Sequence, residues 1–160
     1  MRRISEQSLG NAALHYLRRY SATRKGLTQV LSRKVKRHER LKQVAAPDDA
    51  AALIERVVER MVKAGYVDDR RLAGAKSASL RRQGKSSRAI RLKLRAKGVP
   101  TEVIADATRS TPDEELEAAR TLVRKKKLGV DPLRRQKDLG VLVRAGFSFD
   151  VAKRSLVLGA

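Results

Sequence analysis

Two stretches of this 160-residue chain match at an offset of 48 residues: LRAKGV at residues 94–99, followed by Val103, and LVRAGF at residues 142–147, followed by Val151. Each stretch is typical of a helix that ends at a glycine. The apolar residue after the glycine packs back on the preceding turn, and a new short helix follows. Two such matches predict an internal repeat of about 45–50 residues, each unit holding three helices that stack on neighbouring units.

Helical periodicity and helix-end signals extend this pattern over the rest of the chain. Leu9, Ala13, Tyr16 and Tyr20 fall on one helical stripe, and Thr111-Pro112-Asp113-Glu114 combines an N-cap with a capping-box glutamate. No stretch shows the alternation of a strand. The spacing predicts nine helices, at about 6–20, 23–40, 48–64, 69–83, 87–97, 100–108, 112–127, 132–145 and 148–158.

These signals predict an all-α protein built from three tandem three-helix repeats that form an elongated, curved helical array. We expect the first repeat at residues 1–66, with a basic second helix. The second repeat is expected at residues 67–110 and the third at residues 111–160.

The charge of the chain predicts a polyanionic partner. Lys and Arg number 38 against 17 Asp and Glu, a net charge of +21. The excess is +10 within residues 1–46 and +5 within residues 85–110. Nucleic acid is the first candidate partner, with an acidic protein surface or an anionic membrane as alternatives. Aromatic residues make up only 3% of the chain, so we expect any nucleic-acid contact to be mainly to phosphate.

The composition argues against several chemistries, and we expect neither an enzyme nor a cofactor or metal site. The chain has no cysteine and only two histidines, His15 and His38, both expected at the surface. Gly84-Lys85-Ser86 resembles the end of a phosphate loop, but Ser79 stands where that loop needs glycine, so a turn with a serine helix cap is favoured. The Asp68-Asp69 pair is interpreted as helix capping. No secretory signal or membrane span is recognised, which predicts a cytoplasmic protein without membrane contact. We also expect the protein to be monomeric.

Basic stripes are the candidate binding features. At about 100° per residue, Arg88, Arg91 and Arg95 lie within about 60° of one another, beside an apolar ridge of Ile90 and Leu94. Such spacing is mutually repulsive, which favours an anionic partner, although a simply solvated helix face remains the alternative. Leu92 beside the stripe either packs on another repeat or faces a partner. Arg33, Lys36 and Arg40 form a similar stripe in the first repeat.

Three segments in order resemble the RecX family of RecA recombinase regulators. They are GYVDDRRLA at residues 65–73, GKSSRAIRLKLRAKGV at 84–99 and LVRAGFS at 142–148. Leu72 stands where that family usually has phenylalanine, and the basic helix around residues 33–40 is longer than usual. The resemblance covers about residues 8–158. It implies three tandem repeats that bind the RecA filament on single-stranded DNA, lie in its groove, and inhibit ATP hydrolysis, strand exchange and co-protease activity.

The resemblance places the chain in homologous recombination, DNA repair and the SOS response, and brings no catalytic residues. Its implied partners are the RecA filament, single-stranded DNA and, second, double-stranded DNA. A general helical DNA-binding module that contacts phosphates is the alternative. The candidate RecA- or DNA-binding residues are Arg33, Lys36, Arg37, Arg40, Lys85, Arg88, Arg91, Arg95 and Lys97. The family-signature residues, expected to be structural, are Gly65, Tyr66, Asp68, Asp69, Gly98, Gly146 and Phe147.

Overall fold

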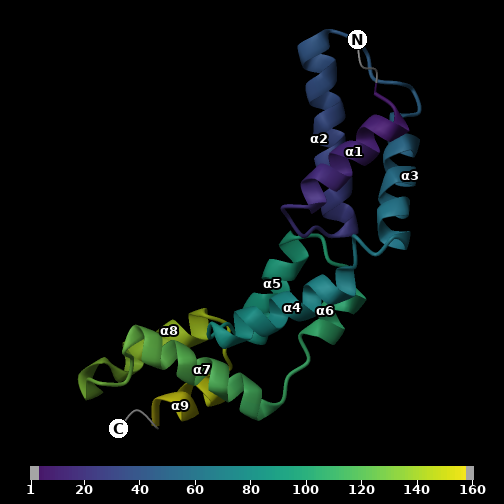
Figure 1. The fold of residues 1–160 in the computed structure, drawn as a ribbon. Helices are drawn as coiled ribbons and strands as arrows, with labels where there is room; N and C mark the ends of the chain where they lie inside the picture. The colour runs from purple at the N-terminus through teal and green to yellow at the C-terminus, as the bar shows by residue number, and fades with distance from the viewer. Residues whose placement is uncertain (1–3, 158–160) are drawn as a thin grey trace. The chain divides into compact units, whose positions relative to one another are not determined.

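The computed structural model describes residues 4–157, and within that range it contains nine α-helices, one short 3-10 helix and no strand (Figure 1). The all-α prediction is therefore confirmed. The elements are α1 (Glu6–Leu17), α2 (Arg24–Lys42), α3 (Ala50–Lys63), α4 (Asp69–Arg82), α5 (Ser87–Ala96), α6 (Thr101–Ala107), α7 (Pro112–Lys126), η1 (Pro132–Arg134), α8 (Arg135–Arg144) and α9 (Phe149–Val157).

Most helix bounds match the prediction, but the first helix is shorter than predicted. α1 ends at Leu17 because Thr23 already caps α2, and the chain needs the residues between them to turn. Tyr20 is therefore not part of the helix, and its side chain is 56% exposed rather than buried on the apolar stripe. The helix predicted at 132–145 begins with a 3-10 turn that Asp131 caps, and its α-helical part starts at Arg135. The predicted end of the last helix, at residue 158, lies outside the described residues.

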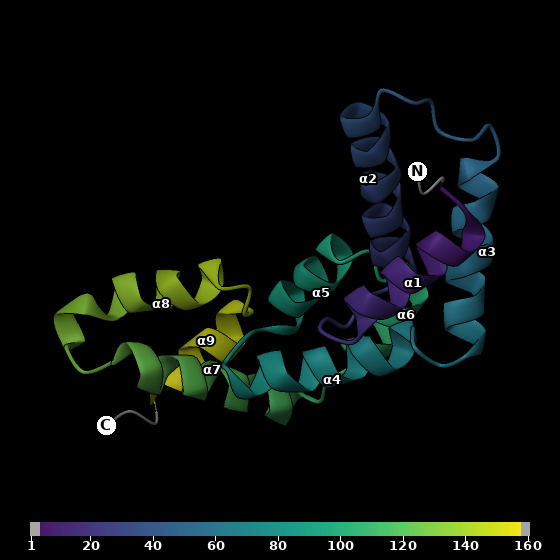
Figure 2. The same cartoon turned by 45° about the horizontal axis from the view of Figure 1, so that its top comes forward.

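The chain forms two compact units, and the first comprises residues 1–72 and 97–99. In it α1, α2 and α3 lie side by side, as both whole-chain views show (Figures 1 and 2). Leu9, Leu27, Leu31, Val57 and Val58 are fully buried at the centre of this three-helix packing. Burial of such side chains, at about 1.5–3 kcal/mol each, is the main source of this unit's stability.

The second unit comprises residues 73–96 and 100–160. α7 and α8 both pack against α9, around a core of Ala119, Leu142, Phe147 and Ala152. Within this unit α5 also packs against α6. The two units are defined by contacts between residues, not by repetition in the sequence. They therefore do not test the three repeat boundaries, which stay a prediction from the sequence.

Candidate functional site

Two aspartates of the signature turn at residues 65–73 accept hydrogen bonds from the first turns of two helices, α4 and α2. Asp68 accepts a hydrogen bond from the backbone N–H of Arg71 at 2.9 Å and so caps α4. Asp69 lies in the first turn of α4, yet its carboxylate accepts from the backbone N–H of Arg24 at 2.9 Å, which is the first residue of α2. Both carboxylates satisfy N–H groups that a helix leaves without a partner, an arrangement that the helix dipole strengthens.

Thr23 adds a second link to the same helix start. Its hydroxyl accepts from the backbone N–H of Gly26 at 2.9 Å and donates to the backbone carbonyl of Lys97 at 2.6 Å. Thr23 is buried, whereas the Lys97 side chain is exposed. Lys97 therefore has a structural backbone contact and a side chain that is free to meet a partner. Gly98, which follows it, has a φ of +79° and lies against the side chain of Lys25.

The outer face of α5 is a cationic strip with a leucine at its centre. Ile90 and Leu94 are fully buried, while Arg88, Leu92 and Arg95 are exposed. Leu92 is 59% exposed, so more than half of its surface is open to solvent and to a partner. Neither Arg88 nor Arg95 has an ion-pair partner in the part of the chain that the structure describes.

Arg91 differs from its two neighbours on α5. Its Nε donates to the hydroxyl of Thr108 at 3.1 Å, and that buried hydroxyl in turn donates to the carbonyl of Ile104. This chain of hydrogen bonds ties α5 to the end of α6. Arg91 was predicted as a binding residue on spacing alone, but the structure also gives it a stabilising contact within the chain.

The start of α5 is a helix cap. Ser86 is fully buried, and its hydroxyl accepts from the backbone N–H of Ala89 and donates to the carbonyl of Ala145 at 2.7 Å. The backbone N–H of Ser87 donates to Glu115. Backbone N–H groups that a phosphate loop would present to a ligand are thus already used, so the predicted serine cap is confirmed. Lys85, directly before this cap, is half-buried.

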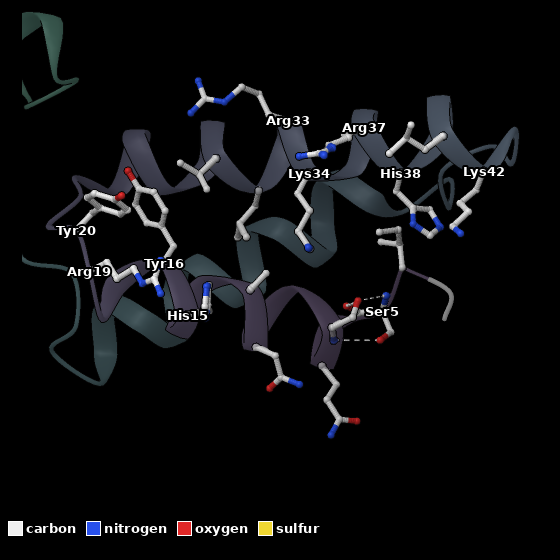
Figure 3. A pocket seen from close by; sticks show the side chains of 18 residues that line it. Ser5, His15, Tyr16, Arg19, Tyr20, Arg33, Lys34, Arg37, His38 and Lys42 are labelled. Carbon is white, nitrogen blue, oxygen red and sulfur yellow. Dashed lines mark hydrogen bonds between the residues drawn. The ribbon is translucent and has the colours of Figure 1, made fainter. Parts of the chain in front are cut away.

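Basic residues of α2 divide between two faces. Arg33, Lys36, Arg37 and Arg40 are all exposed. Arg33 and Arg37 line a groove beside α1 (Figure 3), whereas Lys36 and Arg40 are not among its lining residues. The predicted stripe of Arg33, Lys36 and Arg40 is therefore split by the groove edge.

Sequence reasoning missed the other residues of this groove. Tyr16, Arg19, Tyr20, Lys34 and Lys42 also line it. The tyrosines were assigned to an apolar stripe, Lys34 falls between the positions of the basic stripe, and Lys42 lies beyond its last position. Two tyrosines four residues apart beside Arg18 and Arg19 were the available signal, since aromatic residues among cations are typical of single-strand binding.

The remaining signature residues are placed as follows. Gly65 and Gly146 both have positive φ, at +77° and +98°. Phe147 is buried in the core of the second unit, whereas Tyr66 is 57% exposed. The backbone carbonyl of Gly65 accepts from the Arg71 guanidinium at 3.1 Å. The glycines thus lie in turns and Phe147 lies in the core, whereas the side chain of Tyr66 is open to solvent.

Acidic residues of the first unit are largely engaged by arginines. Arg24 pairs with Glu55 and Glu59, and its pKa is raised, first by the hydrogen bond to Glu55 and then by that to Glu59. Within residues 4–157 no cluster of three His, Asp or Glu side chains could hold a metal ion. No helix in that range combines the length and apolarity needed to cross a membrane.

Comparisons with known proteins all point to the same family. A profile of the RecX second three-helix domain matches residues 68–107. The chain is 43% identical to the regulatory protein RecX of Myxococcus xanthus, over 96% of this chain and 86% of that protein. It is 30% identical to the regulatory protein RecX of Agrobacterium fabrum, over 92% of this chain and 81% of that protein.

A solved structure has the same fold. The crystal structure of RecX from Lactobacillus salivarius superposes with a TM-score of 0.71 at 22% identity, covering 95% of this chain and 94% of that one. The profile matches the segment that contains the Asp68-Asp69 turn, α5 and its cap. With similarity along nearly the whole sequence and a shared helical architecture, this chain belongs to the RecX family of regulatory proteins.

Proposed function

We propose that this chain binds the RecA filament on single-stranded DNA and lowers its ATP hydrolysis, strand exchange and co-protease activity. Family membership supports the assignment, since the relatives are named regulatory proteins and the family resemblance implies RecA as the target. The same naming of relatives favours a regulator over an enzyme. The chain would act by occupying a surface of the filament rather than by chemistry of its own.

The observation that carries the proposal is the outer face of α5. Arg88 and Arg95 supply unpaired positive charge, and the exposed Leu92 lies between them. DNA phosphates need only the cations. An apolar side chain held among cations is better matched by a protein surface with an acidic rim, because burial of the leucine adds to the charge attraction. This combination favours a protein filament over bare DNA as the partner of α5.

The test is RecA ATPase activity on preformed filaments. We expect inhibition at amounts well below one copy per RecA. The variant Arg88→Glu/Arg95→Glu should lose most of that inhibition. Its matched control is Arg135→Glu/Lys137→Glu on α8, two exposed cations with the same change of net charge, from +21 to +17. Circular dichroism should show both variants folded, since exposed substitutions typically cost less than about 0.5 kcal/mol each.

A second variant separates this function from general DNA binding. Leu92→Ser should weaken filament inhibition and leave the affinity for bare single-stranded DNA unchanged, because a phosphate contact does not need the leucine. A general DNA-binding module would instead inhibit only when it saturates the DNA. Excess free DNA would then relieve the inhibition completely, and the variants of α5 would act only through DNA affinity. That result would overturn the proposal.

A further inference from the structure

The groove of the first unit is a cationic channel between α1 and α2 (Figure 3). Its volume is about 1170 Å³. Among the described residues that line it there are five lysines and arginines and two histidines, and there is no aspartate or glutamate. The five cations are Arg19, Arg33, Lys34, Arg37 and Lys42.

The positive charge of this groove is not balanced by the neighbouring acids. Glu6 pairs with Arg56 and Arg60, and Glu39 accepts from the backbone N–H of Ala46. Glu55 and Glu59 pair with Arg24, as described above. None of the five groove cations has an ion-pair partner within residues 4–157. A concave surface lined by one sign of charge attracts a polyanion strongly.

Two tyrosine rings lie at one end of the groove. The ring centroids of Tyr16 and Tyr20 are 5.1 Å apart and the ring planes are inclined at 37°. Tyr16 is half-buried against the core, whereas Tyr20 is 56% exposed. Figure 3 shows Arg19 beside the pair and Lys42 at the far end, with Arg33, Lys34 and Arg37 along α2 between them. The groove therefore offers an aromatic surface at one end and cations along its length.

We propose that this groove is a binding site for single-stranded nucleic acid, with phosphates along the α2 cations and a base stacked on Tyr20. Stacking platforms combined with a cationic track are the usual means of binding single strands without sequence readout. A duplex keeps the faces of its bases inside the stack, so it offers nothing to the tyrosine end. An acidic peptide would satisfy the cations and leave the ring surface unused.

The length of the groove fits a few nucleotides. Lining residues on α2 run from Val30 to Lys42, a rise of about 18 Å at roughly 1.5 Å per residue. At about 3.4 Å per stacked nucleotide, this spans about five nucleotides. The site goes beyond the proposed filament contact, because it concerns nucleic acid without RecA. It belongs to α1, the turn that follows it and α2, rather than to α5.

The experiment measures binding of a fluorescein-labelled single strand of about 10 nucleotides by anisotropy, without RecA. We expect Tyr20→Leu to weaken binding by about tenfold, within the usual range for loss of one base stack. Tyr20→Phe keeps the ring and should bind as the parent does. The control Tyr66→Leu removes an exposed tyrosine outside the groove and should also bind as the parent does.

A charge-matched pair tests the cationic track. Arg33→Gln/Arg37→Gln should reduce the slope of log affinity against log salt by about 1.4, at roughly 0.7 per phosphate on single strands. Arg135→Gln/Lys137→Gln makes the same change of net charge, from +21 to +19, at two exposed cations of α8 outside the groove. Its slope should stay close to that of the parent. If Tyr20→Leu loses helicity by circular dichroism, the two double variants to glutamine decide whether the groove binds the single strand, because the side chains that they replace are exposed.

Two competitors separate the other occupants. A duplex of the same sequence should bind without dependence on Tyr20, and poly-glutamate should compete only at a large excess of charge. The proposal is overturned if both groove variants bind the single strand as their controls do. It is equally overturned if poly-glutamate binding shows the full loss in Tyr20→Leu, which would assign the groove to an acidic protein segment. The anisotropy experiment contains no RecA, so a negative result in it does not bear on the proposed filament contact. Equally, a failure of this chain to inhibit RecA filaments would not bear on the proposed single-strand site.

Discussion

Substitution of Gly146 by alanine should destabilise the second unit through backbone strain and through one identified contact, that with Ser86. Gly146 follows α8 with a φ of +98°, and a Cβ built there would lie 2.5 Å from the Ser86 hydroxyl oxygen and 3.2 Å from Cβ of Arg88. That hydroxyl is fully buried and donates to the carbonyl of Ala145 while it accepts from the N–H of Ala89. The added methyl group would force the hydroxyl away from both partners.

The magnitude has two parts. A non-glycine residue in the left-handed region costs about 1–2 kcal/mol. Loss of the Ser86 cap costs about 1 kcal/mol, and loss of its second hydrogen bond about 1 kcal/mol more. We therefore expect Gly146→Ala to lower the free energy of unfolding by about 3–4 kcal/mol. Gly65→Ala, at a φ of +77° with open space around its Cβ, should cost only the backbone part, about 1–2 kcal/mol.

Urea unfolding followed by far-UV circular dichroism measures these changes in the free energy of unfolding. Gly65→Ala is evaluated on the transition of the first unit and Gly146→Ala on that of the second. A double-mutant cycle isolates the contact. In a Ser86→Ala background the hydroxyl is already absent, so Gly146→Ala should cost at least about 1 kcal/mol less than it does in the parent. The reasoning is refuted if Gly146→Ala costs no more than Gly65→Ala, or if the Gly146 and Ser86 substitutions are additive.

Three further predictions concern stability and salt. Arg91→Met should lower the free energy of unfolding by about 1 kcal/mol, because it removes the hydrogen bond to Thr108. Arg88→Met should change it by less than about 0.5 kcal/mol. Equal effects of the two substitutions in urea unfolding would contradict a stabilising role of Arg91. Asp69→Ala should cost about 1 kcal/mol, because the first N–H of α2, that of Arg24, loses its acceptor; an unchanged urea midpoint would exclude this link. Affinity for bare single strands should fall linearly on a log–log salt plot, by roughly 0.7 per phosphate contacted, with little preference between unrelated sequences; a salt-independent affinity would show that phosphates are not the contact.

Helix ends could be predicted from the sequence where the signal is local. Thr111 and Glu114 form the reciprocal capping box that their spacing predicts. The Ser148 cap of α9, through the N–H of Val151, is equally local. Such caps can be predicted because donor and acceptor lie within three residues of each other. Sequence does not always reveal a cap: Asp49 is the N-cap residue of α3, yet its side chain makes no cap hydrogen bond.

Contacts between distant segments could not be predicted. Nothing around Asp69 indicates that its carboxylate accepts from Arg24, 45 residues away. The spacing of Arg91 matches that of Arg88 and Arg95, yet only the packing of α6 provides Thr108 as its partner. Tyr20 fitted a helical stripe because periodicity continues past the point where the chain turns. The groove follows from the packing of α1 on α2, which no single stretch of sequence encodes.

Inhibition of preformed RecA filaments is the most direct test of the central claim. The measurement is the RecA ATPase rate on single-stranded DNA as this chain is titrated in, with the parent, Arg88→Glu/Arg95→Glu and the control Arg135→Glu/Lys137→Glu compared at equal concentration. The account predicts inhibition by the parent and the control well below one copy per RecA, and little inhibition by the α5 variant. Equal inhibition by all three folded proteins would contradict it, and so would inhibition that appears only when the DNA is saturated.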